Sequence, residues 1–199
     1  MRAVASSVIS PLDRWIPRAD IREHHSVVIA AQADVVMRVA MSIDLRDVAL
    51  VRAIFWLRAK WMRARQARAP GPGGFVPDLL AMGWGKLAEV PDHLFVAGAF
   101  CQPWQAEVVF EPGDSERFAT SWPAARVKIA WTLQAEALPD GCTRFASETR
   151  AVATDEAARA RFLRYWRWAR FGIVAIRWLL LPAIRRQAER EARAAARDR

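Results

Sequence analysis

The sequence predicts an α+β fold in which a curved antiparallel β-sheet is wrapped around one long C-terminal helix. Two observations carry this prediction. Strand-like segments dominate the second half of the chain, and the clearest of them, residues 127–136, alternates apolar and polar side chains. The last such segment ends near Arg150 and leads into a long helical stretch of tryptophan, arginine and branched apolar residues. The wide apolar face of such a helix must pack against another element, and a curved sheet leaves space for a ligand beneath it.

Composition indicates one domain. With 199 residues, 53% of them hydrophobic, the chain can bury a core of its own. We expect an irregular segment over residues 1–20, the domain over residues 21–184 and a charged helical tail over residues 185–199. The net charge of +9 suits an anionic partner. Lysine occurs only three times, however, so the excess is almost entirely arginine, which a compositional bias of the source genome also produces.

The first half of the chain predicts one strand and two helices. Residues 21–31 form the strand, because β-branched side chains fill its centre. The helices follow over residues 34–43 and 47–67, and in the second of them apolar residues recur at helical spacing. Residues 70–74 read Pro-Gly-Pro-Gly-Gly and form a loop. This loop lacks the Gly-Lys-Ser/Thr ending of a phosphate-binding loop, so we expect no phosphate site there.

The second half predicts antiparallel strands. Residues 84–90 and 94–101 form a hairpin around a Pro-Asp-His turn. Residues 127–136 form a strand with one buried and one exposed face, and its partner covers residues 143–153. The long helix then begins at Asp155, with an acidic residue favourable in its first turn.

Two residues mark the limits of this helix. Thr154 is the expected N-cap, because a hydroxyl can accept a hydrogen bond from the first free backbone amides. Pro182 lacks a backbone donor and clashes with the preceding turn, so we expect a kink or a break just before it. Beyond Pro182 the expected tail is solvated or frayed.

The turn Pro139-Asp140-Gly141 decides where the polar residues of the last strand point. A type I turn with Gly141 in a bulge would pair Glu136 with Arg144 and place Glu148 and Arg150 on the outer side of the sheet. A two-residue turn would shift the register by one and bring both residues to the inner side. Proline at the first turn position favours the bulge.

A membrane-spanning role does not fit the last helix. Its most apolar part contains three arginines, each of which costs roughly 2.5 to 3.5 kcal/mol near a bilayer centre. Arg170 and Arg177 are seven residues apart and share a helical face, while apolar residues occupy another. The helix is therefore expected to be amphipathic.

The succession of segments resembles the START-like superfamily, also called SRPBCC, which includes polyketide cyclases, lipid-transfer domains and birch-pollen-allergen-type proteins. The similarity covers about residues 21–189 and is greatest to uncharacterised bacterial members. Five segments carry it: Arg22-Glu23-His24-His25, Val96-Ala97-Gly98-Ala99-Phe100 leading to Trp104, Ala130-Trp131-Thr132, Ser147-Glu148-Thr149-Arg150-Ala151 followed by Thr154-Asp155-Glu156-Ala157, and Phe162-Leu163-Arg164-Tyr165-Trp166.

This resemblance implies a helix-grip fold, with two helices after the first strand and a deep apolar pocket between the sheet and the last helix. Members use the pocket for lipids, for polycyclic compounds or for catalysis. We therefore expect a small hydrophobic ligand, such as a lipid or a polyketide-like compound. The aromatic and apolar residues expected to line the pocket are Trp104, Phe118, Trp122, Trp131, Tyr165, Trp166 and Ile173.

Evidence for catalysis is thin. Glu148 and Arg150 are the weak catalytic candidates, because they are the plausible buried polar pair. His24 and His25 are adjacent in a strand and point to opposite faces, so they cannot act together. No metal site is expected, because no His, Cys or carboxylate spacing matches a zinc pattern. We expect no cofactor, and a cyclase- or dehydratase-like enzyme acting in the same pocket stays an alternative.

The remaining partner hypotheses concern surfaces. Arg170 and Arg177 could meet the lipid phosphates of an anionic membrane, with nearby tryptophans at the headgroup level. Nucleic acid is not expected, because the aromatics lie in apolar faces rather than among exposed basic strand residues. Cys101 and Cys142 have no disulfide pattern, which suits a cytoplasmic protein, with the inner membrane surface as a peripheral location. No feature of the sequence assigns an oligomeric state.

Overall fold

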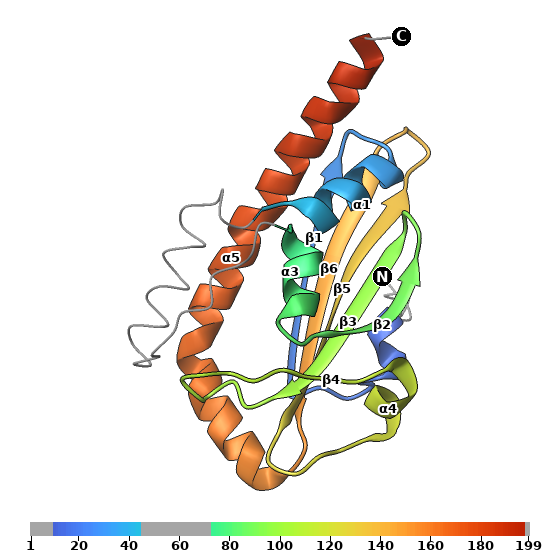
Figure 1. Ribbon diagram of the computed structural model, residues 1–199. Helices are drawn as coiled ribbons and strands as arrows, with labels where there is room; N and C mark the ends of the chain where they lie inside the picture. The colour runs from blue at the N-terminus through green and yellow to red at the C-terminus, as the bar shows by residue number, and fades with distance from the viewer. Residues whose placement is uncertain (1–9, 45–72, 198–199) are drawn as a thin grey trace, which may run out of the picture.

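The computed structural model describes residues 10–44 and 73–197, except for the side chains of residues 176 and 177. Within these residues, six strands form one antiparallel sheet with the order β1-β6-β5-β3-β2, and β4 pairs with the end of β3 (Figure 1). The strands are β1 (Ile21–Ile29), β2 (Gly85–Val90), β3 (Leu94–Cys101), β4 (Glu111–Pro112), β5 (Val127–Ala137) and β6 (Thr143–Ala153).

Helices cover both faces of the sheet. One face, here called the helix side, packs against α1 (Ala33–Ser42), α3 (Phe75–Ala81) and the long α5 (Glu156–Arg197) (Figure 1). The opposite face, here called the outer side, is covered by the short 3-10 helix η1 (Pro11–Arg14) and by α4 (Ser115–Thr120). The predicted α+β class, with a curved antiparallel sheet and a long C-terminal helix, is confirmed. The helix expected over residues 47–67 lies outside the described residues.

The β5–β6 turn has the bulged geometry that the sequence favours. Gly141 has a φ of 78°, a left-handed conformation that glycine adopts without strain. The Leu138 amide donates to the Cys142 carbonyl at 2.8 Å, and Glu136 lies opposite Arg144 in the register. This register confirms the prediction that Glu148 and Arg150 point to the outer side.

The larger core lies on the helix side. Alternate residues of β3, β5 and β6 point into it, and α1 and the C-terminal half of α5 cover them. Among its fully or almost fully buried members are Ile29, Val36, Met37, Phe95, Leu133, Phe145, Ile184 and Ala188. A smaller cluster, formed by Val127, Ala151 and Phe162, holds the start of α5 on the same face.

A second core lies on the outer side, where the sequence predicts an exposed strand face. Leu12, Trp15 and Ile16 pack against the sheet, and α4 adds Phe118. As a result most of β5 is buried on both faces, and its polar residues Lys128 and Thr132 are almost inaccessible. The prediction of an exposed face on this strand is wrong for Lys128, Ala130 and Thr132, because segments outside the sheet cover them, whereas Glu136 near the end of the strand is exposed as expected. Residues 10–16, which the sequence places outside the domain, belong to this core.

Both ends of α5 differ from expectation. Asp155 rather than Thr154 caps the helix, because Oδ1 of Asp155 accepts a 2.7 Å hydrogen bond from the Ala158 amide. Thr154 instead bonds to the backbone of Arg126. The helix continues through Pro182, so the break expected there does not occur.

The packing of α5 beyond Pro182 gives the physical reason. Ile184 and Ala188 are buried against the helix-side core, and Oε2 of Glu191 lies 3.4 Å from a guanidinium nitrogen of Arg38 on α1. Leu180, which precedes the proline, is also buried in this core, so packing holds the helix on both sides of Pro182 and offsets the lost hydrogen bond. The first half of the expected free tail is therefore docked onto α1.

Candidate functional site

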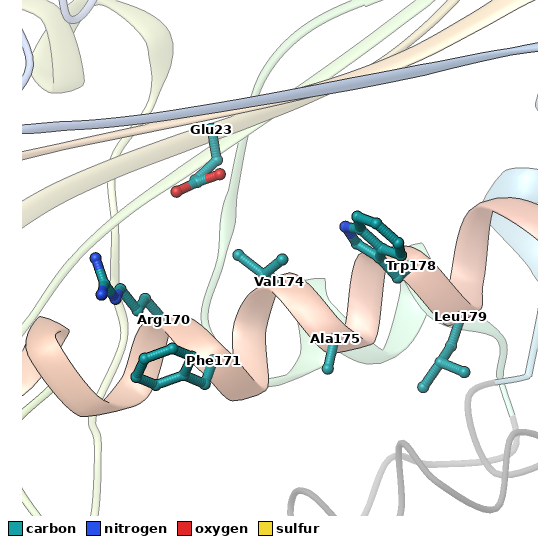
Figure 2. Close-up of a pocket in the computed structure, with 7 residues that line it drawn as sticks. All are labelled: Glu23, Arg170, Phe171, Val174, Ala175, Trp178 and Leu179. Atoms are coloured by element: carbon teal, nitrogen blue, oxygen red, sulfur yellow. The ribbon is translucent and has the colours of Figure 1, made fainter.

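An apolar groove runs along the middle of α5. The helix is packed near its start through Phe162 and near its end through Leu180 and Ile184. Between these anchor points a groove of about 550 Å³ opens beside the first residues of β1 (Figure 2). Its lining is Glu23 of β1 and, from α5, Arg170, Phe171, Val174, Ala175, Trp178 and Leu179.

The spacing of these helix residues explains why they form one wall. They occupy positions i, i+1, i+4, i+5, i+8 and i+9, which fall on one side of an α-helix. Five of the six are apolar, and two of them are far more exposed than core residues: Phe171 is 62% and Trp178 is 71% exposed. An apolar surface of this kind is typical of a binding site.

The polar edge of the groove comes from β1. Glu23 and His25 alternate onto the same face of the strand, whereas His24 points away and is exposed. Figure 2 shows the Glu23 carboxylate reaching from the strand toward α5. Nε2 of His25 lies 3.6 Å from Oε2 of Glu23, which is too long for a hydrogen bond, and it has no other partner among the described residues. Nε2 of His25 is thus a buried polar atom without a hydrogen bond, although His25 itself is not among the residues that line the groove.

Two further buried donors lack a partner on the helix side. Nε1 of Trp84 and Nε1 of Trp104 make no hydrogen bond with any described residue. Trp84 packs beside Trp131 at a centroid distance of 6.1 Å, and Trp104 packs in the cluster that holds Phe162. An unsatisfied buried donor costs about 1 to 3 kcal/mol, so each is a group that a hydrogen-bond acceptor would stabilise.

The seven aromatic and apolar residues expected to line one pocket are not brought together. Trp131 is buried in the helix-side core, against Phe75, Trp84 and Phe95. Three others, Trp104, Tyr165 and Trp166, pack near the start of α5. Ile173 is half-buried on α5 and is not among the residues that line the groove.

Phe118 and Trp122 lie on the outer side of the sheet. Phe118 is fully buried there, beneath η1 and against Phe100, at a centroid distance of 5.0 Å. Trp122 is half exposed and covers the ammonium group of Lys128. Neither residue can share a pocket with the side chains under α5, because the sheet separates them. The sequence-based prediction missed most of the groove residues because it chose ligand-binding residues from the face of α5 that packs against the sheet. The row formed by residues 170, 174 and 178, four positions apart, was the signal in the sequence that could have identified the groove.

Glu148 and Arg150 form a buried ion-pair network on the outer side. Nε of Arg150 donates to Oε1 of Glu148 at 2.7 Å, and Nη1 of Arg150 donates both to Oδ1 of Asp13 and to the Ile16 carbonyl, each at 2.7 Å. The Ser10 hydroxyl donates to Oε2 of Glu148 at 2.6 Å.

The charge state of this network follows from its contacts. Burial by itself would raise the pKa of Glu148, but hydrogen bonds from Ser10 and Arg150 and the charges of Arg150 and Arg22 outweigh it, so the pKa lies below its ordinary value. Burial likewise opposes the charge on Arg150, but Glu148 and Asp13 outweigh it and raise the pKa of Arg150. The network stays ionised and holds the N-terminal segment onto the sheet.

Lys128 is a second unusual charge on the outer side. Its side chain is fully buried, and its ammonium lies 4.5 Å from the ring centroid of Trp122 and 4.8 Å from that of Phe118. The Ala119 carbonyl accepts a 3.2 Å hydrogen bond from it. Because no carboxylate among the described residues pairs with this amine, burial lowers the pKa of Lys128 to about 8.

The expected membrane-contact residues have different positions. Arg170 lines the groove, and its guanidinium lies 4.9 Å from the ring centroid of Phe171. The side chain of Arg177 lies outside the described residues. No helix that the structure describes is long and apolar enough to cross a bilayer. The described residues also contain no cluster of three His, Cys, Asp or Glu side chains able to hold a metal ion.

Comparison of the chain with protein-family models, with curated proteins and with solved structures found no match. The resemblance to the START-like superfamily therefore stays a prediction, based on the succession of sequence segments.

Proposed function

We propose that the protein binds a small, mainly hydrophobic molecule in the groove beside α5, in a START-like helix-grip fold. The observation that carries the proposal is the groove itself. Its volume of about 550 Å³ falls in the range of small-molecule sites, and its wall is almost entirely apolar. The helix is anchored at both sides of this stretch, so the opening is part of the packed structure.

The polar groups at the edge indicate what kind of molecule would fit. Glu23 and Arg170, which both line the groove, place a negative and a positive group beside an apolar wall. An amphipathic molecule, with a hydrocarbon or polycyclic body and a polar end able to hydrogen-bond, matches this arrangement.

Binding without turnover is the simpler reading of the site. The weak catalytic candidates Glu148 and Arg150 lie on the opposite face of the sheet from the groove, so they cannot meet its occupant. Both oxygens of Glu148 are also engaged by Ser10, Arg150 and Arg22. A cyclase- or dehydratase-like reaction would need another acid or base, and Glu23 is the carboxylate among the residues that line the groove.

The test uses a neutral apolar dye, N-phenyl-1-naphthylamine, whose fluorescence rises in an apolar site. Ala175→Trp places a large side chain in the groove and is expected to weaken dye binding at least tenfold. Ala160→Trp is the matched control, because Ala160 is an exposed alanine of the same helix outside the groove. The control should bind the dye within about twofold of the parent protein.

Two results would overturn the proposal. One is unchanged dye binding by Ala175→Trp in a protein whose circular dichroism spectrum is unchanged. The other is an equal loss in Ala160→Trp, which would place the dye elsewhere. Native mass spectrometry of the protein purified from cells supplies an independent readout, because a retained ligand should be absent from Ala175→Trp and present in the control.

A further inference from the structure

The charged residues in the middle of α5 all carry the same sign. Between Glu156 and Glu189 the helix contains no aspartate or glutamate, but it contains eight arginines: Arg159, Arg161, Arg164, Arg167, Arg170, Arg177, Arg185 and Arg186. Two of these are neutralised, Arg159 by Asp20 at 2.7 Å and Arg185 by Glu189 at 2.8 Å. Arg164, Arg167 and Arg170 are exposed and make no ion pair with any acidic residue that the structure describes. Their charges are available to an external anion.

Exposed aromatic rings share the side of the helix that carries Arg164 and Arg167. At 100° per residue, Arg164, Arg167, Trp168, Phe171 and Trp178 fall within an arc of about 100°. The three aromatic side chains are 62%, 62% and 71% exposed, respectively. We call these five residues the basic aromatic stripe. An exposed apolar stripe of this kind marks an interaction surface, because a monomer in water gains nothing by exposing it.

We propose that the basic aromatic stripe docks the protein on an anionic lipid surface, with α5 lying in the plane of the headgroups. Arginine can bond to lipid phosphates in a bidentate way, while its carbon stem and the neighbouring rings contact the acyl boundary. Indole rings are the side chains most enriched at this depth of a bilayer. A nucleic acid would meet the arginines equally well, but it gives no reason for apolar rings spread over about 15 Å of helix.

The stripe adjoins the groove. Phe171 and Trp178 belong to both, so docking would turn the open side of the groove toward lipid. Arg164, Arg167 and Trp168 belong to the stripe alone. The docking proposal therefore does not depend on ligand binding, and the two can be tested with different variants.

The experiment is co-sedimentation of the full-length protein with vesicles of phosphatidylcholine alone and with vesicles containing about a third phosphatidylglycerol. The parent protein is expected to pellet with the anionic vesicles and to be released by high salt. The double variant Arg164→Glu/Arg167→Glu should partition at least tenfold more weakly, because each basic residue near an anionic surface contributes several-fold. Trp168→Ala should also bind more weakly, with the same salt dependence.

The matched control is Arg14→Glu/Arg18→Glu. It changes the net charge by the same amount at two exposed arginines of the N-terminal segment, which covers the outer side of the sheet. This control should pellet like the parent protein. Equal losses of vesicle binding in the two double variants would show that net charge alone attracts the protein, which would overturn the proposal. Vesicle binding by Arg164→Glu/Arg167→Glu as strong as that of the parent protein would also overturn it.

Two more measurements separate the remaining outcomes. Ala175→Trp should pellet with the anionic vesicles at least as well as the parent protein although it loses the dye, which distinguishes failure of the docking proposal from failure of the proposed function. The second measurement is the effect of Trp168→Ala on binding to heparin and to anionic vesicles. If this change weakens neither, the stripe is a general polyanion site and does not recognise a lipid surface.

Discussion

The hydroxyl of Ser10 donates a 2.6 Å hydrogen bond to the carboxylate of Glu148, although the two residues are 138 positions apart in the chain. This bond joins the N-terminal segment to a central strand of the sheet, within a network in which Glu148 and Arg150 are both almost fully buried. The network is a structural element of the fold, and removing it should lower the free energy of unfolding.

Glu148→Gln is expected to lower the free energy of unfolding by about 3 kcal/mol, because it leaves the buried guanidinium of Arg150 without its principal counter-charge. Urea unfolding followed by circular dichroism measures the change. Glu136→Gln is the matched control, since Glu136 forms an exposed pair with Arg144 at 2.8 Å and should contribute less than about 1 kcal/mol. A loss no larger in Glu148→Gln than in the control would contradict this account.

The same network predicts how stability depends on acid. The pKa of Glu148 in the folded protein lies below its value of 4.5 in the unfolded chain. The stability from this group is therefore present above that value and is lost as the pH falls through the folded pKa. Glu148→Gln should make the loss of stability between about pH 6 and about pH 3 smaller than in the parent protein. The unfolding free energy of each protein is measured by urea unfolding at a series of pH values. An equal dependence of this free energy on pH in the two proteins would refute the assignment.

Much of the sheet could be predicted from local sequence. The alternation in β5 located the strand, and Pro139-Asp140-Gly141 identified both the turn and the bulged register. These features depend on residues close together in the chain. The short helices α3 and α4 were missed, because helices of seven and six residues are too short to show a hydrophobic period.

The outer layer and the groove could not be predicted for a different reason. Lys128, Glu148 and Arg150 are polar, so their alternation in the strands indicates a solvated face. The N-terminal segment, far away in the sequence, covers Glu148 and Arg150, and Phe118, Ala119 and Trp122 cover the ammonium of Lys128. The groove likewise depends on where α5 is anchored along the sheet. The sequence identified the amphipathic helix, but the residues chosen from it belonged to the face that packs.

Gly98 tests how tightly the outer layer is packed. A Cβ at this position would lie 2.7 Å from Cδ1 of Leu87 and 2.8 Å from Cζ of Phe118, so Gly98→Ala should cost about 1 to 3 kcal/mol. Phe118→Leu removes the ring that the new Cβ would meet. The double variant Gly98→Ala/Phe118→Leu should therefore lose less stability than the sum of the losses in the two single variants. Strict additivity in urea unfolding would show that the two residues do not meet.

Lys128 should make stability depend on alkaline pH. Its folded-state pKa of about 8 lies below the ordinary value of 10.5, so the cost of burying the charge is fully present below about pH 8. As the pH rises from there toward the unfolded value, the folded state loses its proton first and becomes relatively more stable. Lys128→Met, which carries no charge, is expected to be more stable than the parent protein at about pH 7.

The decisive quantity is the difference in unfolding free energy between Lys128→Met and the parent protein at two pH values. This difference should shrink between about pH 7 and about pH 10, because the parent protein regains the cost of the buried charge over that interval. Lys86→Met provides the control, since Lys86 is an exposed lysine on β2 paired with Glu89 at 2.9 Å, and its replacement should change stability little at either pH. A difference for Lys128→Met that stays constant with pH would mean that the amine, although enclosed by Trp122 and Phe118, is solvated in the folded protein.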